Sequence, residues 1–421
     1  MENGIAGRIA RPFINSRLTP LLMAAFIAVG IYGTLLTPRE EEPQIDVPMA
    51  DIFVGYPGAS PEEVEKRISI PLEKIIANIA GIEYVYSTSM PGRAMVSARF
   101  YVGEDVERSL VRLYNEIMKH MDQMPDGATM PLVKTRSIDD VPIMTLTLWS
   151  EQYDDFELRR LAREYELEIR QIEDVAQTKI HGGRSRQIRV ELDKEKMAAY
   201  RLDPFWISQK IESANIQLNP GSIKKNDEEI LVIAGDFLRS AEDVSNLVMD
   251  VRNGEPVYLK SVASVMDGAE DPADYVAYGM GKGLAVQMNR SPGQAFPAVT
   301  LSIAKRPGTD AMTIASQILD KTDRLKGTLI PAEVEITVTR NYGETASKKV
   351  LSLLEHLLAA VLAVTFVVVL AMGWRGGLVV FLSVPITFAL TLFVYYMFGY
   401  TLNRITLFAL VFVTGIVVDD S

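Results

Sequence analysis

Two adjacent aspartates, Asp419 and Asp420, follow an uncharged stretch that runs from Ile405 to Val418. If a helix begins near Arg404, Asp419 lies about 22 Å along it at ~1.5 Å per residue, past the middle of a ~30 Å hydrocarbon core. An ionised carboxylate at that depth costs several kcal/mol, so it must be paired, hydrated or protonated. Burial and a like-charged neighbour both raise the pKa of a carboxyl group, as a proton carrier requires. The pair is therefore a candidate proton relay.

A second interpretation is that this helix begins earlier, within the uncharged run 376–403, so that the aspartates mark its hydrated end. The polar, turn-like residues from Gly399 to Arg404 favour the later start. Neighbouring side chains on a helix diverge by about 100°, so both face a bundle interior only if the bundle surrounds them. The other expected helices carry no basic residue, and a cationic partner for the pair must come from elsewhere.

The rest of the sequence offers little enzyme chemistry. It contains no cysteine and three histidines, His120, His181 and His356, without the spacing of metal ligands. No glycine-rich phosphate loop follows a predicted strand, and the acidic runs 40–42 and 227–229 are interpreted as solvated surfaces. We therefore expect no enzyme activity, no metal and no cofactor. The lack of cysteine suits an oxidising compartment.

Charge is unevenly distributed along the 421 residues, whose formal net charge is −11. Residues 1–38 carry +2 and residues 341–421 are neutral, so the middle segment 39–340 carries −13. An acidic segment without a cluster of lysine or arginine is a poor match for phosphate backbones, so we expect no nucleic-acid partner. The composition, 48% hydrophobic, combines an acidic soluble region with membrane segments.

The segment 1–38 predicts a cytoplasmic start followed by a membrane span. The uncharged run from Leu18 to Pro38 is long enough to cross a bilayer, and the basic residues before it are Arg8, Arg11 and Arg17. Because basic residues stay in the cytoplasm, the chain emerges outside at Arg39. A cleaved signal peptide is the alternative, but the run exceeds the ~7–15 apolar residues of such peptides and lacks a small-residue cleavage site.

The segment 341–421 predicts three further membrane helices, the last one cut short. We interpret Trp374 to Gly377 as a cytoplasmic turn between the first two, and Phe398 to Tyr400 as the break before the third. Pro385 is tolerated inside a membrane helix because neighbouring groups satisfy the freed carbonyl. With alternating directions, the acidic segment lies wholly outside the cytoplasm.

The external segment begins with a ferredoxin-like pattern over 39–140. A strand over 49–56 precedes a helix that opens with a capping box from Ser60 to Glu63. A hairpin, a second helix and a strand near Leu132 complete the order strand, helix, strand, strand, helix, strand. The buried face expected for the second helix consists of Val106, Leu110, Leu113, Ile117 and Met121.

The opening of this pattern recurs about ninety residues later, which predicts a repeated unit. We place a second ferredoxin-like unit in two pieces, 141–181 and 285–340, interrupted by an insertion over 182–284. The insertion has its own strand from Gln187 to Leu192 and a helix start at Asp203-Pro204, and it is interpreted as an independent subdomain. The predicted fold class is thus a membrane helical bundle plus α+β units.

Several of these motifs together resemble one transporter family. They are Arg11-Pro12, Tyr56-Pro57-Gly58-Ala59, Trp374-Arg375, Val384-Pro385 and Gly415-Ile416-Val417-Val418-Asp419-Asp420. The chain is similar over its whole length to the resistance-nodulation-cell division (RND) superfamily of efflux pumps, in its hydrophobe/amphiphile branch.

The resemblance implies a homotrimeric inner-membrane antiporter that couples proton entry to the export of small amphiphilic compounds. It makes the two ferredoxin-like units porter subdomains and the insertion a docking subdomain that faces an outer-membrane channel or a periplasmic adaptor. The pair Asp419 and Asp420 takes up protons opposite a lysine from a second half of the protein. Family members have twelve membrane helices, and this sequence contains the first four.

Substrate residues are not assigned by the resemblance. Drug pumps of the family line their deep pocket with phenylalanines, whereas the matching stretches 138–141 and 180–182 contain none. Two other functions remain open: heavy-metal efflux, whose branch normally has one acidic residue at the pair, and a membrane-tethered translocation or assembly factor, which predicts a single ferredoxin-like unit. A third alternative is an inert truncated product.

Overall fold

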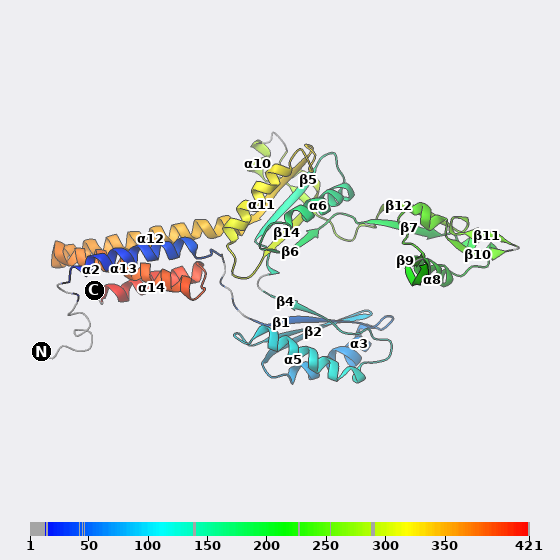
Figure 1. Cartoon of the computed structure of the whole chain (residues 1–421), viewed down its shortest axis with the longest axis horizontal. Helices are drawn as coiled ribbons and strands as arrows, with labels where there is room; N and C mark the ends of the chain where they lie inside the picture. The colour runs from blue at the N-terminus through cyan, green and yellow to red at the C-terminus, as the bar shows by residue number, and fades with distance from the viewer. Residues whose placement is uncertain are drawn as a thin grey trace.

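In a computed structural model the chain is elongated, with a helical bundle at one end and two α/β units beside it (Figure 1). A smaller subdomain projects at the far end (Figure 1). The structure describes residues 13, 16–41, 43, 45, 47–137, 140–225, 228–252, 254–287 and 291–419.

The bundle consists of four helices: α2 (Leu18–Leu36), α12 (Tyr342–Met372), α13 (Trp374–Met397) and α14 (Arg404–Asp419). Among the described residues, α2, α12 and α13 are long and apolar enough to cross a membrane, and α14 is a shorter apolar helix. The start of α14 agrees with the later of the two positions considered for the fourth helix. Most of the apolar side chains point outward, and the buried core of the bundle includes Val361, Val384, Phe388, Leu407 and Leu410.

The connection between α12 and α13 corrects one expectation. The turn was placed at Trp374 to Gly377, but α13 already begins at Trp374. A single residue, Gly373, makes the turn with a φ of 86°, a left-handed conformation that glycine adopts without strain. Arg375 therefore lies in the first turn of a helix rather than in a loop.

Helix α2 packs against α13 through small residues. A Cβ atom on Gly30 would lie 2.3 Å from the Cβ of Ala389, and one on Gly33 would lie 3.0 Å from the Cα of Phe393. Only glycine allows backbones to approach this closely, as is common between membrane helices. This contact fixes the first helix on the bundle.

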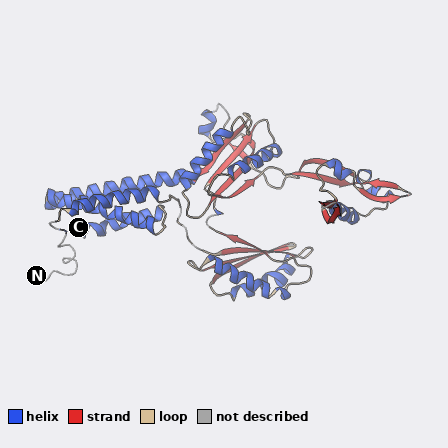
Figure 2. Cartoon of the chain, viewed as in Figure 1, coloured by secondary structure: helices blue, strands red, loops and turns tan. Residues whose placement is uncertain are grey.

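The first α/β unit has the element order expected from the sequence. Its strands are β1 (Met49–Gly55), β2 (Ile82–Met90), β3 (Arg93–Phe100) and β4 (Leu132–Arg136). Its helical segments are α3 (Pro61–Val64), a π-helical turn (Glu65–Ser69), α4 (Ile70–Ala77), α5 (Val106–Lys119) and a short 3-10 turn (Met121–Gln123). The strands form an antiparallel sheet in the order β2-β3-β1-β4, with the helices on one face (Figure 2).

Local sequence signals explain where the first helix of this unit begins, and burial shows which part of α5 faces the core. The capping box is present: the Ser60 side chain accepts a hydrogen bond from the Glu63 backbone, and the Glu63 side chain accepts one from the Ser60 backbone. In α5, Leu113 and Ile117 are buried as expected, whereas Val106 is 39% exposed. Val106 is the first residue of the helix and lies outside its buried face, in contrast to the expectation.

The second unit repeats the same sheet order with strands from distant parts of the chain. Its main strands are β5 (Met144–Ser150), β6 (Val175–His181), β14 (Ala295–Lys305) and β15 (Val334–Asn341), with helices α6 (Asp155–Ile169) and α11 (Ala311–Leu325). They pair in the order β6-β14-β5-β15, which matches the first unit position by position. A fully buried core joins the two helices to the sheet, and its members include Leu146, Leu148, Tyr165, Leu301 and Ile318.

The insertion is a separate small body between β6 and β14. It contains α7 (Lys194–Ala199), α8 (Pro204–Ala214), α9 (Ala241–Ser245), a 3-10 turn (Leu259–Ser261) and the strands β7 (Arg186–Leu192), β8 (Leu218–Lys225), β9 (Glu228–Ala234), β10 (Val248–Arg252), β11 (Glu255–Tyr258) and β12 (Ala263–Ala269). Its own core contains Ile207, Met249, Leu259 and Val262. The predicted helix start is observed, because the Asp203 side chain caps α8 and Pro204 is its first residue.

The far border of the insertion differs from the expected one at 284. Strand β13 (Ala277–Gly279) pairs with β14, and the helix α10 (Lys282–Gln287) follows it. Tyr278 stacks on Trp149 of the second sheet with ring centroids 4.8 Å apart. Residues 277–287 therefore pack on the second unit, through long-range contacts that sequence patterns do not reveal.

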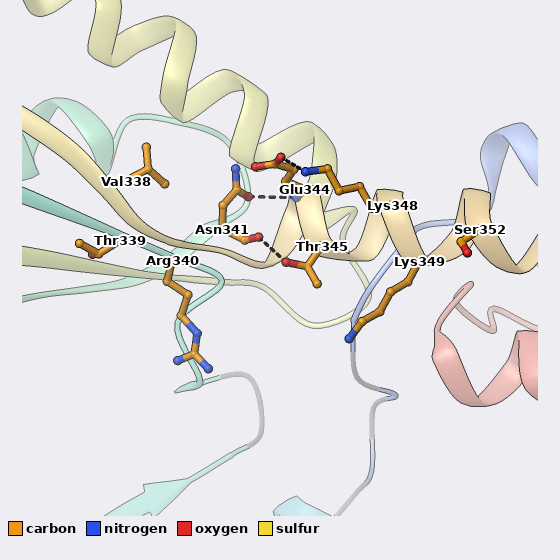
Figure 3. Close-up of a pocket in the computed structure, with 9 residues that line it drawn as sticks. All are labelled: Val338, Thr339, Arg340, Asn341, Glu344, Thr345, Lys348, Lys349 and Ser352. Atoms are coloured by element: carbon orange, nitrogen blue, oxygen red, sulfur yellow. Dashed lines mark hydrogen bonds and ion pairs between the residues drawn. The ribbon is translucent and has the colours of Figure 1, made fainter. Parts of the chain in front are cut away.

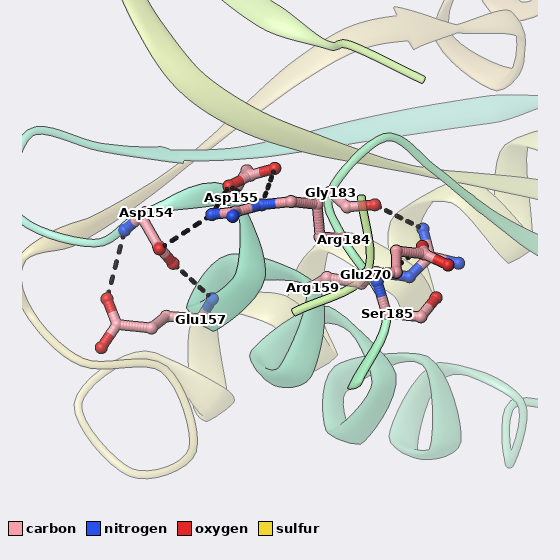
Figure 4. Close-up of polar contacts among 8 residues, drawn as sticks. All are labelled: Asp154, Asp155, Glu157, Arg159, Gly183, Arg184, Ser185 and Glu270. Carbon is pink, nitrogen blue, oxygen red and sulfur yellow. Dashed lines mark hydrogen bonds and ion pairs between the residues drawn. The ribbon is translucent and has the colours of Figure 1, made fainter. Parts of the chain in front are cut away.

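A polar neck joins the insertion to the second unit (Figure 4). The Arg184 guanidinium donates to both carboxylate oxygens of Asp155 at 2.6–3.0 Å and to Asp154 at 3.1 Å. Asp154 also caps α6. The Ser185 backbone donates to the Glu270 side chain at 2.7 Å, and the Glu270 backbone donates to the Ser185 carbonyl. These contacts therefore hold both chain segments that connect the insertion to the second unit.

Candidate functional site

The predicted proton relay lies at the end of α14. Asp419 is the last residue of this helix, fifteen positions after Arg404, which places its backbone about 22 Å from the helix start. Asp420 lies outside the described residues. The role of the two carboxylates stays a prediction from the sequence.

Helices α12 and α13 do carry basic residues, and one of them, Arg375, lies in the first turn of α13. Lys348 and Lys349 belong to α12, because that helix begins at Tyr342, well before its apolar part. Lys348 and Lys349 lie just after the point where β15 continues into α12 (Figure 3), whereas α14 runs away from the α/β units toward the chain end (Figure 1). The expected absence of basic residues from the first three membrane helices thus holds only for their apolar parts.

A buried ionic joint connects the bundle to the second unit at the other end of α14. We define the joint as Glu40, Glu41, Lys305, Lys349 and Thr401. The Lys305 ammonium forms an ion pair with the Glu40 carboxylate, and the two side chains are 8% and 3% exposed. The Thr401 hydroxyl donates to the other Glu40 oxygen at 2.9 Å. Glu40 thereby binds the end of β14 and the loop between α13 and α14.

Backbone contacts reinforce the joint. The Glu40 N–H donates to the Leu402 carbonyl at 3.1 Å, and the Leu402 N–H donates to the Pro38 carbonyl at 2.8 Å. The Arg39 N–H donates to the Asp310 carboxylate at 2.8 Å, and the N–H of Ala311 donates to the Arg39 carbonyl at 3.1 Å. The segment 38–40 therefore runs as a short strap between the membrane helices and the start of α11.

The joint extends to α12 beside an open polar crevice. Lys349 forms an ion pair with Glu41 at 2.6 Å. The crevice, about 480 Å³, lies where β15 passes directly into α12 (Figure 3). Asn341 caps this helix by accepting from the Glu344 N–H at 3.0 Å, and Glu344 pairs with Lys348 on the next turn. Helix α12 therefore continues the second sheet without an intervening loop.

The acidic run at 40–42 was interpreted as a solvated surface, and this was wrong for two of its residues. Glu40 is 3% exposed, and the Glu41 side chain is 12% exposed. Sequence reasoning missed them because their partners Lys305 and Lys349 lie hundreds of positions away. In the run 227–229, Glu228 and Glu229 are exposed as expected, and Asp227 lies outside the described residues.

A second feature is a cleft of about 640 Å³ between the two sheets. Side chains alternate along a strand, so Ala50, Ile52 and Val54 of β1 face the helices while Asp51 and Phe53 face the cleft. The opposite wall comes from β6 and β14 of the second unit, with residues that include Gln177, Lys179, His181, Ser302 and Ala304.

Polar interactions order both walls of the cleft. Asp51 is nearly buried and accepts from the Ser97 hydroxyl at 2.6 Å and from the Arg136 guanidinium. On the other wall, His181 Nε2 and the Ser302 hydroxyl lie 2.9 Å apart. Burial lowers the pKa of His181 below its ordinary value of 6.5, and Lys179 lowers it further. The imidazole is therefore mainly neutral at pH 7.

The sequence matches the AcrB/AcrD/AcrF family over residues 9–421. The chain belongs to this family. Its members are RND permeases, in agreement with the resemblance inferred from the motifs. The bundle helices, the two α/β units and the insertion all lie within the matched residues.

Relatives in this family include proteins named multidrug resistance protein MdtC. They come from Yersinia enterocolitica serotype O:8 / biotype 1B (strain NCTC 13174 / 8081), Yersinia pseudotuberculosis serotype O:1b (strain IP 31758) and Yersinia pestis bv. Antiqua (strain Angola). Each is 28% identical over 410 residues, covering 96% of this chain and 38% of the relative. The chain therefore spans less than half the length of these relatives.

Proposed function

We propose that the chain is part of a proton-driven efflux transporter of the inner membrane that exports hydrophobic or amphiphilic compounds. The observation that carries this proposal is the buried joint. It ties the strap after α2, the loop before α14 and the end of β14 into one unit. Strand β14 also forms a wall of the cleft. A change in the membrane helices thus has a direct route to a cavity that accepts a small molecule.

In this proposal the two α/β units are ferredoxin-like porter subdomains, over 39–140 and over 141–181 with 285–340. The insertion over 182–284 is a docking subdomain for a periplasmic adaptor and an outer-membrane channel, and the transporter works as a homotrimer. The shared strand order supports the pairing of the units. The alternative of a translocation factor predicted a single such unit, and the family assignment does not favour heavy-metal efflux.

The proposed mechanism begins at Asp419 and Asp420. Protonation from the outer side neutralises the carboxylates, whose negative charge is costly within the bilayer. Release of the proton to the cytoplasm restores that charge. The two protonation states favour different positions of α14, because only the charged state needs a cationic or hydrated partner. The loop at Thr401, at the other end of α14, carries the displacement through Glu40 to Lys305. The cleft between the units then alternates between open and closed forms.

The test measures proton-coupled export in the complete transporter reconstituted into liposomes. We expect Asp419→Asn and Asp420→Asn each to abolish substrate-dependent proton movement, followed with a pH-sensitive dye inside the liposomes. Glu62→Gln, an exposed carboxylate on α3, is the matched control and should leave coupling intact. Normal coupling in both aspartate variants would falsify the relay.

A further inference from the structure

The cleft between the units has an unusual balance of charge on its two walls. Lys134 projects from β4 of the first unit, and Lys179 projects from β6 of the second. Both side chains are exposed, and within the described part of the chain neither forms an ion pair with a carboxylate. One free ammonium group from each wall thus lines the same cavity.

Among the described residues that line the cleft, cationic side chains outnumber carboxylates, with Lys134, Arg136 and Lys179 against Asp51 and Asp140. Asp51 lies opposite Lys134 in the sheet register, but its oxygens accept from Ser97 and Arg136. The Lys134 ammonium lies instead 5.7 Å from the centroid of the Phe53 ring. The other lining carboxylate, Asp140, accepts a hydrogen bond from the Ser137 backbone at 2.8 Å. Asp51 is paired with Arg136, so a charged ligand meets two lysines and one carboxylate, Asp140.

The rest of the lining suits the other parts of an amphiphile. Phe53, Pro142 and Ala304 offer apolar surface, and Gln177 offers an amide donor. The hydroxyl groups of Thr178 and Ser302 donate to Glu166 and to the Lys179 carbonyl. A cavity of about 640 Å³ is in the range of small-molecule sites, which typically measure ~300–1,000 Å³. Phenylalanine is present at a single described position of this lining, so polar recognition has a larger share than in an aromatic pocket.

We propose that this cleft binds amphiphiles with an anionic head group, such as a carboxylate or sulfonate. The head group lies between Lys134 and Lys179, and the apolar part contacts Phe53. The inference rests on the proposed function, in which this cleft is the substrate site, and adds the charge class of the substrate. The two lysines hold the anion from opposite walls, so binding draws the two units together.

The experiment compares two fluorescent probes that differ by one sulfonate. 1-Anilinonaphthalene-8-sulfonate is anionic, and N-phenyl-1-naphthylamine is its neutral counterpart. Binding to the chain in lipid nanodiscs is measured by fluorescence titration, with empty nanodiscs as background. We expect the anionic probe to bind more tightly, and its affinity to fall about tenfold in Lys134→Gln/Lys179→Gln, equal to about 1.4 kcal/mol. The neutral probe should bind the variant and the unchanged chain equally.

Lys194→Gln/Lys224→Gln is the matched control, because it removes two exposed lysines of the insertion. Equal loss of anion affinity in the control, or equal loss for both probes, would overturn the head-group site. A second measurement needs no variant: raising the salt from about 0.05 M to about 0.5 M should weaken the anionic probe only.

The possible results distinguish the preference for anions from the assignment of the cleft as a substrate site. If both probes bind in the cleft with equal affinity, and the lysine variant changes neither, the cleft remains a substrate site but its preference for anions is wrong. If neither probe binds above the empty-disc background, the cleft itself is not a substrate site, and both the inference and that part of the proposed function fail.

Discussion

Glu40 and Lys305 lie 265 positions apart in the sequence and form a buried ion pair at the junction of membrane helices and α/β units. Removing two charges from water is expensive, and the pair is tolerated only because further hydrogen bonds complete it. Thr401 donates to Glu40, and Lys305 also donates to the Arg306 carbonyl at 3.3 Å. The junction therefore depends on both partners being present.

Lys305→Ala should loosen this junction strongly, because it leaves the Glu40 carboxylate buried without its cation. Loss of one partner of a buried pair costs about 3–5 kcal/mol. We expect hydrogen exchange of the amides at 39–41 and 401–403 to accelerate by about two orders of magnitude. The control is Lys66→Ala, which removes an exposed pair with Glu62 and should change exchange around it by less than about fivefold. Similar changes in both variants would contradict a special role of the buried pair.

Gly30→Ala should separate α2 from α13. The added Cβ would lie 2.3–2.5 Å from the Cβ, Cα and carbonyl oxygen of Ala389, so the backbones must move apart. Overpacking of this kind typically costs ~1–3 kcal/mol. We expect a lower midpoint of thermal unfolding in detergent micelles, followed by helical circular dichroism. Gly415→Ala on α14 has no atom within 4 Å of its new Cβ and should leave the midpoint unchanged or raise it slightly.

Arg184→Ala should loosen the polar neck that holds the insertion against the second unit. The guanidinium holds Asp154 and Asp155 with several hydrogen bonds, and a forked donor of this type is not replaced by lysine. We expect faster hydrogen exchange at 182–186 and at 270, with an intermediate effect for Arg184→Lys. The insertion core around Leu259 should keep its protection. Arg239→Ala removes an exposed pair with Asp236 and is the control; an equal effect there would count against the neck.

Acidification should strengthen binding of the anionic probe in the cleft. Burial and Lys179 lower the pKa of His181 below 6.5, while Asp274 raises it, so His181 gains its charge as the pH falls below that value. The new cation joins a wall where an anion already binds, whereas the sulfonate stays ionised throughout. We expect the affinity to rise a few-fold between pH 7 and pH 5 and the rise to disappear in His181→Gln. The other charged groups lining the cleft are Lys134, Arg136, Asp51 and Asp140.

A rise that persists in His181→Gln would contradict the assignment of the pH effect to this imidazole. The neutral probe serves as the control, because its binding should not depend on the charge of the imidazole. Acidification has the opposite effect on the stability of the fold, which it lowers. Because the folded chain disfavours protonated His181, this residue makes the α/β region less stable as the pH falls below 6.5.

Local signals in the sequence were sufficient for most elements. The capping box at Ser60, the proline at the start of α8 and the break at Gly399 all act within a few residues, so their consequences are readable without a fold. The start of α14 followed from the polar residues before Arg404. The turn at 374–377 was misplaced because Trp374 and Arg375 are compatible with both a helix start and a loop.

The sequence by itself predicted the apolar helices, the repeated order of strands and helices and the place of Asp419 at the end of α14, because these depend on apolar run length and on periodicity. Only the tertiary structure decided that Glu40 is buried against Lys305, and that Lys134 and Lys179 line one cleft. Both relationships join residues from separate units, across 265 positions in the first case. No local propensity encodes such a contact, since it arises when sheets and helices pack and remove particular charges from water.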